Sequence, residues 1–209
     1  IVQADSQLEP TSIALEMTGR LPMSGGTISW SKGDDEPRRI SMKRLRALSS
    51  VVDSPDVTAP EQHMRVHDYG SEMLSYNLPI FGRSRASRWL AERGLEELDS
   101  LWMDEISGEM NIELMAALAK HSPSDLLVFD TPSRHLNHTY MWLPYLEELA
   151  ADEDHPRTVV AVVPHISESW HGARAVVGRA PEENAPDPVE GEVESSNDSP
   201  EHGENAEKE

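Results

Sequence analysis

Residues 124–164 constrain the fold of this chain most strongly, because two apolar runs enclose one helical pattern. Residues 126–130 read Leu-Leu-Val-Phe-Asp, residues 158–163 read Thr-Val-Val-Ala-Val-Val, and a proline closes each run. Such continuous runs predict strands that are buried on both faces. Between them, apolar residues recur with the spacing of an amphipathic helix at Tyr140, Leu143, Leu146 and Leu149. This order predicts a right-handed βαβ unit in a parallel sheet.

The remaining patterns extend this prediction to an α/β domain, in which helices flank a mainly parallel sheet. We expect strands near 1–5, 125–129 and 158–163, and helices near 40–49, 84–93, 95–106, 109–120 and 138–150. The domain then spans 1–179, with a helical region inserted at about 38–120. Residues 8–11 are predicted as a turn, 27–30 as a short strand and 53–60 as a linker that contains two prolines.

The last thirty residues differ from the rest in composition. Residues 180–209 contain eleven acidic residues, one lysine and no aromatic residue. A segment of this kind cannot bury enough apolar surface to offset the entropy of ordering. We therefore predict a disordered acidic tail, which either screens partners or is a passive solvated extension.

The lack of cysteine bears on the cellular compartment, and the lack of a long apolar run bears on whether the chain spans a membrane. The chain has no cysteine, which excludes disulfides and thiolate metal sites and favours a reducing compartment, so we expect a cytoplasmic protein. It also has no uninterrupted apolar run of about 18 residues, the length that a membrane-spanning helix requires.

One basic segment stands out in a chain whose net charge is −20. Five bases fall within nine residues at Arg38, Arg39, Lys43, Arg44 and Arg46, and apolar residues lie between them at helical spacing. DNA or an acidic protein could bind such a segment. The alternative is that these bases pair with carboxylates of the same chain. A second copy of the chain is a further candidate partner.

Histidines follow both predicted core strands. His135 and His138 come after the first strand, and His165 after the second. Because ligands bind at the carboxyl ends of parallel strands, a hydrolase that uses Asp130 with one of these imidazoles is one hypothesis. No Gly-x-Ser-x-Gly motif supports a serine nucleophile.

Two carboxylate-ended strands together resemble a known family. The first reads Ile-Val-Gln-Ala-Asp at 1–5, and the second reads Leu-Leu-Val-Phe-Asp-Thr-Pro at 126–132. They resemble the corresponding strands of the deviant-Walker ATPases, the ParA/MinD-like partition and positioning proteins. In that family the second strand is Walker-B-like, and its aspartate belongs to the magnesium site.

This resemblance implies ATP and Mg²⁺ as cofactors and assigns roles to four residues. Asp130 would hold Mg²⁺ through water, Asp5 would lie near the attacking water, and Thr131 would respond to the γ-phosphate. Pro164 would lead into the loop that binds the base. The oxygen ligands implied here are those that Mg²⁺ prefers.

The chain departs from the family at the phosphate-binding loop. No Gly-x-x-x-x-Gly-Lys-Ser/Thr motif occurs in the 209 residues. In this family the loop precedes the strand that ends at the Asp5 position, so the resemblance places it before Ile1, and the chain is expected to be truncated at its amino end. The competing hypothesis is a non-catalytic assembly or adaptor protein that is processed from a larger precursor.

Overall fold

The computed structural model describes residues 1–4, 9–23, 25–33, 35–77, 84–136, 138–167 and 170–178. These residues belong to one compact unit, Ile1–Arg179. The predicted acidic tail at 180–209 and the candidate site residue Asp5 lie outside the described residues. No helix in the described ranges has the length and apolar character that a membrane span needs.

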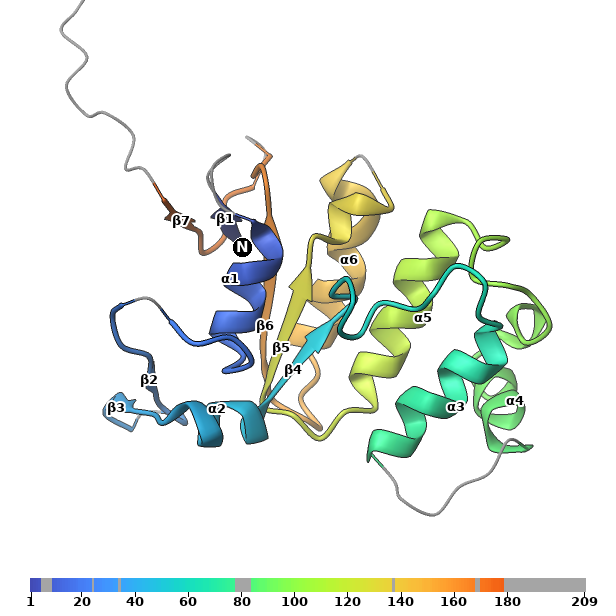
Figure 1. Cartoon of the computed structure of the whole chain (residues 1–209), viewed down its shortest axis with the longest axis horizontal. Coiled ribbons are helices and arrows are strands. Elements are labelled where there is room, and N and C mark those ends of the chain that lie inside the picture. The colour runs from blue at the N-terminus through green and yellow to red at the C-terminus, as the bar shows by residue number, and fades with distance from the viewer. Residues whose placement is uncertain are drawn as a thin grey trace, which may run out of the picture. The chain divides into compact units, whose positions relative to one another are not determined.

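A five-stranded sheet forms the centre of the domain, with the order β4-β5-β6-β1-β7. Every neighbouring pair in it is parallel. Its strands are β1 (Val2–Ala4), β4 (Ser49–Val52), β5 (Leu126–Asp130), β6 (Thr158–Val163) and β7 (Ala175–Val177). The predicted α/β fold with a mainly parallel sheet is confirmed (Figure 1).

The inner strand β5 shows why the apolar runs form buried strands. All five of its residues are buried, and successive side chains point to opposite faces. Leu127 and Phe129 belong to one hydrophobic core, and Leu126 and Val128 to another. The sheet therefore separates two cores, each covered by helices.

The larger core lies under the helices α3 (Val66–Asn77), α4 (Ser84–Ala91), α5 (Gly108–Lys120) and α6 (Thr139–Ala150). The smaller core lies under α1 (Pro10–Met17), α2 (Met42–Leu48) and the antiparallel strands β2 (Ser29–Trp30) and β3 (Arg38–Arg39). Figure 1 shows α1 and α2 apart from the group formed by α3, α4 and α5. The predicted helices near 40–49, 84–93, 109–120 and 138–150 are present.

Three predictions about local structure were wrong. Residues 95–106 contain only the 3₁₀ turn η1 (Glu96–Leu98), because the chain after it pairs with the segment before α3. Val66 N–H donates to Leu101 at 3.0 Å, and Met103 N–H donates to Met64 at 2.9 Å. The turn expected at 8–11 is instead the start of α1, since proline is well tolerated at a first helical position.

The third error concerns the linker expected at 53–60. The strand β4 directly precedes this segment and lies at the edge of the main sheet. The helix α2 ends at Leu48, and Ser49 already has extended backbone angles of φ −125° and ψ 149°. Residues after 52 are therefore held at the carboxyl end of a strand and are not a free linker.

Candidate functional site

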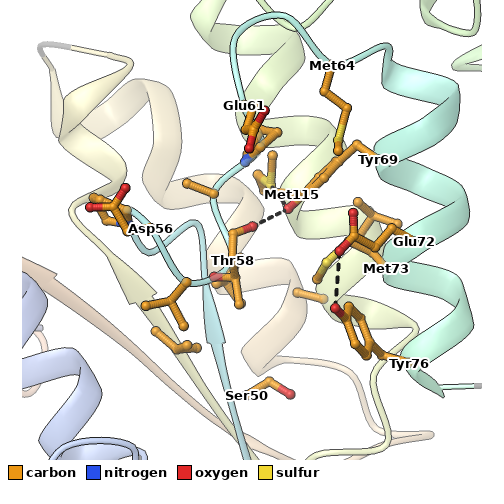
Figure 2. A pocket seen from close by; sticks show the side chains of 18 of the residues that line it. Ser50, Asp56, Thr58, Glu61, Met64, Tyr69, Glu72, Met73, Tyr76 and Met115 are labelled. Carbon is orange, nitrogen blue, oxygen red and sulfur yellow. Dashed lines mark hydrogen bonds between the residues drawn. The ribbon is translucent and has the colours of Figure 1, made fainter.

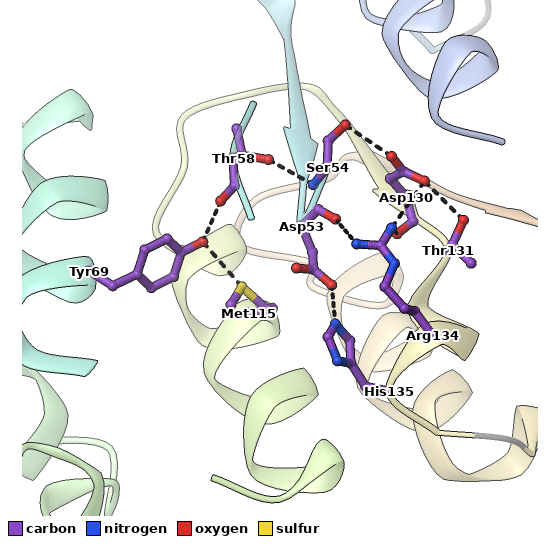
Figure 3. A network of polar contacts seen from close by, with 9 residues as sticks. All are labelled: Asp53, Ser54, Thr58, Tyr69, Met115, Asp130, Thr131, Arg134 and His135. Carbon is purple, nitrogen blue, oxygen red and sulfur yellow. Dashed lines mark hydrogen bonds and ion pairs between the residues drawn. The ribbon is translucent and has the colours of Figure 1, made fainter. Parts of the chain in front are cut away.

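Polar side chains meet where β4 and β5 end. Val52 and Phe129 are paired in register, so Asp53 and Asp130 are the next residues on neighbouring strands. Asp53, Ser54, Asp130, Thr131, Arg134 and His135 form the strand-end cluster (Figure 3). The fold places this cluster at the sheet edge where parallel α/β proteins bind ligands.

Asp130 is fully buried, and both of its carboxylate oxygens have protein partners. Ser54 Oγ donates to Oδ2 at 2.9 Å, and Thr131 Oγ1 donates to Oδ1 at 2.9 Å. The Nη2 atom of Arg134 lies 3.5 Å from Oδ1. These contacts compensate the cost of a buried charge, and they leave Asp130 closed to solvent.

Arg134 joins the two strand ends through their backbone. Its Nη1 atom donates to the carbonyl of Asp53 at 3.2 Å and its Nη2 atom to the carbonyl of Asp130 at 3.0 Å. The short 3₁₀ helix η2 (Pro132–Arg134) turns the chain back so that the guanidinium reaches both carbonyls. Arg134 therefore fixes the spacing of the two loops.

Asp53 and His135 form a second pair in the cluster. Oδ2 of Asp53 lies 2.6 Å from Nε2 of His135, and the two side chains are 3% and 25% exposed. A carboxylate only accepts, so Nε2 of His135 is the donor in this contact. Oδ1 of Asp53 is buried and has no hydrogen-bond partner. An oriented imidazole of this kind can act as a general base if a substrate reaches it.

The backbone around the cluster is strained. Among the residues that the structure describes, three other than glycine have positive φ: Asp53 at 56°, Asp56 at 57° and Thr131 at 53°. All three lie in the loops that follow β4 and β5. A β-branched residue rarely adopts this conformation, so Thr131 stores strain of about 1–3 kcal/mol that its surroundings must hold.

A pocket of about 1060 Å³ lies beside the edge strand β4 (Figure 2). The loop after β4 and the helix α3 form most of its walls, and Met64, Met73, Tyr76, Met115 and Leu118 give it an apolar lining. Arg134 also lines it, so the pocket adjoins the strand-end cluster.

Tyr69 and Thr58 connect this pocket to the cluster. The Tyr69 hydroxyl donates to the Thr58 carbonyl at 2.8 Å, and the Ser54 N–H donates to Thr58 Oγ1 at 3.0 Å. Burial raises the pKa of Tyr69 well above its usual range, and the charges of Asp53 and Glu72 raise it further. Tyr69 is therefore a neutral hydrogen-bond donor in the folded protein.

The helix that follows β1 begins with residues that are unfavourable for phosphate. Glu9 occupies the N-cap without a side-chain capping bond, and Pro10, the first helical residue, has no N–H. The Ser12 N–H donates back to the Glu9 carbonyl at 3.0 Å. Anions bind at helix starts through free N–H groups and positive charge. Here the first helical residue has no N–H, the N–H of Ser12 faces the Glu9 carbonyl, and the N-cap residue carries a carboxylate.

The predicted site residues are only partly brought together. Asp130 and Thr131 are in contact within the strand-end cluster, whereas Pro164 is exposed after β6 and has no hydrogen bond to the cluster. Of the three candidate histidines, His135 joins the cluster, His138 stacks on Tyr140, and His165 is exposed. Asp53 and Arg134 were not predicted, because the loops that position them have no periodic pattern.

The cluster does not fit Mg²⁺ as it is arranged. Its oxygen donors are of the type that Mg²⁺ prefers, but those of Asp130 are engaged, and Arg134 supplies a positive charge at the same carboxylate. Across the described ranges no group of three or more His, Cys, Asp or Glu side chains could hold a metal ion.

Comparison with known proteins supports the fold but identifies no family. No protein-family model and no curated protein matches the sequence. Among solved structures, the domain is similar to an ABC transporter ATP-binding protein from Pyrococcus furiosus, with a TM-score of 0.54 and 12% identity over 84% of this chain and 83% of that chain. The specific resemblance to ParA/MinD proteins is not confirmed. The similarity shows a shared α/β fold that is built on a parallel sheet.

Proposed function

We propose that this chain is a non-catalytic assembly or adaptor protein built on a P-loop NTPase fold. The start of α1 carries this proposal. P-loop proteins bind phosphates at a strand-to-helix junction with backbone N–H groups and a lysine. At the junction between β1 and α1, this chain has the anionic Glu9 and then Pro10, which lacks an N–H.

The state of Asp130 gives independent support. A Walker-B-like carboxylate has to reach the water shell of Mg²⁺, whereas Asp130 is fully buried and bonded to Ser54 and Thr131. Arg134 already supplies a positive charge at this carboxylate. The cluster therefore joins β4 to β5 and stabilises the fold without a bound metal.

The test is nucleotide binding by the full natural chain that contains this sequence. Equilibrium dialysis with ATP and Mg²⁺ should give no saturable binding up to about 1 mM, and phosphate release should not exceed that of an Asp130→Asn variant. A native complex should also keep its composition in ATP with Mg²⁺ and in EDTA. Saturable, Mg²⁺-dependent binding that Asp130→Asn abolishes would overturn the proposal.

That outcome would favour the second candidate, a ParA/MinD-like nucleotide-binding protein. The position of Asp130 at the end of a central strand in a P-loop fold favours this candidate. Asp130 would then hold Mg²⁺ through water after Arg134 moves away, and Thr131 would sense the γ-phosphate. Asp5, Pro164 and a dimeric assembly would keep the roles that the family resemblance implies.

A phosphate-binding strand that another part of the natural protein supplied would also need a place in the sheet. β5 has β4 and β6 as neighbours, and β1 has β6 and β7. A further strand could pair only at β4 or β7 and could not lie beside the Asp130 strand. This constraint supports the adaptor proposal over the second candidate.

A further inference from the structure

Four exposed bases lie on two neighbouring elements, and we call these four residues together the basic surface. Arg38 and Arg39 form β3, and Lys43 and Arg44 lie in the first turn of α2, which begins three residues after β3. All four side chains are exposed. Figure 1 shows β3 and α2 next to each other at one end of the domain.

These bases do not pair with the carboxylates that the structure describes. Within the described part of the chain, the side chains of Arg38, Arg39, Lys43 and Arg44 make no ion pair and no hydrogen bond, although the domain is acidic. Two exposed bases elsewhere are paired, Arg88 with Glu92 at 2.9 Å and Lys120 with Glu148 at 3.2 Å, whereas Lys32 and Arg174 make no ion pair within the described ranges. Carboxylates of the described residues therefore do not pair with these bases, and internal pairing could involve only acidic residues outside the described ranges.

Neighbouring arginines increase the positive potential. Arg46 donates to the Gly19 carbonyl at 2.8 Å, and Arg20 donates to the Ser49 carbonyl at 3.0 Å. These carbonyl contacts neutralise neither charge. Burial lowers the pKa of Arg20, and the charge of Arg46 lowers it further.

The surface is held on a fixed support. Ser41 Oγ caps α2 by accepting from the Arg44 N–H at 3.3 Å, and Leu45 anchors the helix in the smaller core with 1% exposure. The Ile40 N–H donates to the Ile28 carbonyl at 3.0 Å and joins the segment to β2. The charges are therefore presented by ordered backbone.

The character of the surface favours a phosphate backbone over a protein. Protein interfaces are usually centred on buried apolar anchors. The exposed large apolar residues in the described ranges all lie elsewhere: Val57, Tyr76, Trp102, Tyr140, Val176 and Val177. Trp30, which pairs with Arg38, is half-buried and packs against the smaller core, so the exposed groups of the basic surface are cations. Such a surface binds through charge, which is how proteins bind nucleic acid without regard to sequence.

We propose that the basic surface binds the phosphate backbone of nucleic acid, independently of base sequence. The net charge of −20 opposes this binding at long range. At 0.1 M salt, however, charges separated by more than about 10 Å are largely screened, so the local surface dominates. The inference does not depend on the adaptor role, because it uses none of the residues at the strand ends.

The test measures binding of a fluorescent 20-base-pair DNA duplex by anisotropy at several salt concentrations. Four phosphate contacts predict a slope of log K against log salt of about −3.6. The variant Lys43→Gln with Arg44→Gln should weaken binding at least about tenfold at 50 mM salt and reduce the slope by about 1.8. Circular dichroism checks that each variant is folded.

A matched control removes the same charges elsewhere. Arg88→Gln with Lys120→Gln also deletes one arginine and one lysine, but from residues that are already paired. This control should change affinity less than about twofold. Equal losses in the two double variants would overturn the proposal. So would the absence of DNA binding at 50 mM salt with retained binding of polyglutamate, which would identify an acidic protein as the partner.

Discussion

Nε2 of His135 lies 2.6 Å from Oδ2 of Asp53, and this contact joins the loop after β5 to the loop after β4. The two residues are 82 positions apart in the chain. Arg134, the neighbour of His135, also bonds to the Asp53 carbonyl. Consecutive residues of one loop therefore hold both the side chain and the backbone of Asp53.

Replacing Asp53 should measure what this pair contributes to stability. Asp53→Ala removes a buried hydrogen-bonded carboxylate and should lower the free energy of unfolding by about 2 kcal/mol in a urea titration. Asp56→Ala is the matched control, because Asp56 also has positive φ but is exposed, so only the backbone cost of about 1 kcal/mol should remain. Equal losses in both variants would show that the pair contributes nothing.

Asp130 and Arg134 should behave as a coupled pair. Asp130→Ala leaves Arg134 and the Ser54 hydroxyl without their partner. It should therefore lower the free energy of unfolding by about 3 kcal/mol. In a double-mutant cycle with Arg134→Met, the coupling energy should exceed about 1 kcal/mol. Arg88→Met, which removes an exposed base far from the cluster, should show no coupling to Asp130→Ala. If the losses of free energy from Asp130→Ala and Arg134→Met were additive, the contact between the two side chains would not contribute to stability.

Gly108 should not tolerate a methyl group, although it begins a helix. A Cβ atom at Gly108 would overlap the carbonyl oxygen of His135, so Gly108→Ala should lower the melting temperature by several degrees. Gly70→Ala is the control inside α3, where the nearest atom would lie 3.9 Å away. There the higher helix propensity of alanine should stabilise the protein by up to about 1 kcal/mol. A neutral Gly108→Ala would argue against the close approach of α5 to His135.

Tyr69 should make stability depend on pH in the alkaline range. In the unfolded chain the phenol ionises near pH 10, while burial keeps it protonated in the folded state. Above pH 10 the unfolded state therefore binds fewer protons, and stability should fall by up to about 1.4 kcal/mol per pH unit. At pH 7, Tyr69→Phe should be less stable by about 1 kcal/mol, because it loses the bond to Thr58.

The difference in the free energy of unfolding between wild type and Tyr69→Phe should shrink as pH rises from 10 to 11.5, since phenylalanine does not ionise. Tyr140→Phe, at a residue that is 71% exposed, should follow the wild-type curve throughout. Parallel curves for wild type and Tyr69→Phe would contradict the proposed burial effect. Chemical denaturation at each pH provides the measurement.

The sequence predicted β5 and β6 well because their apolar runs are long enough to be buried without help from polar partners. β4 was missed because it has four residues and two of them are serines. Ser49 Oγ donates to the Thr18 carbonyl at 3.1 Å, and Ser50 Oγ lies 2.8 Å from Ser124 Oγ. Partners that are 31 and 74 residues away satisfy these hydroxyls, and no local pattern can show them.

The same reason limits prediction of the site. Asp130 could be predicted because it ends an apolar run, and a strand end fixes where its side chain lies. Asp53 could not be predicted, because the strand before it was not visible in the sequence. Arg134 depends on the 3₁₀ turn after Pro132, whose direction is set by bonds to two strand ends.

The position of β1 has a consequence for how the protein is made. This strand pairs with β6 and β7, since Val2 lies opposite Val162 and Ala175. At roughly 5–20 residues per second, a ribosome needs about 10–35 s to synthesise the chain between Val2 and Ala175. During that time β1 has no partner, so the sheet can close only after β6 and β7 have been synthesised, and a chaperone that shields β1 would have time to act.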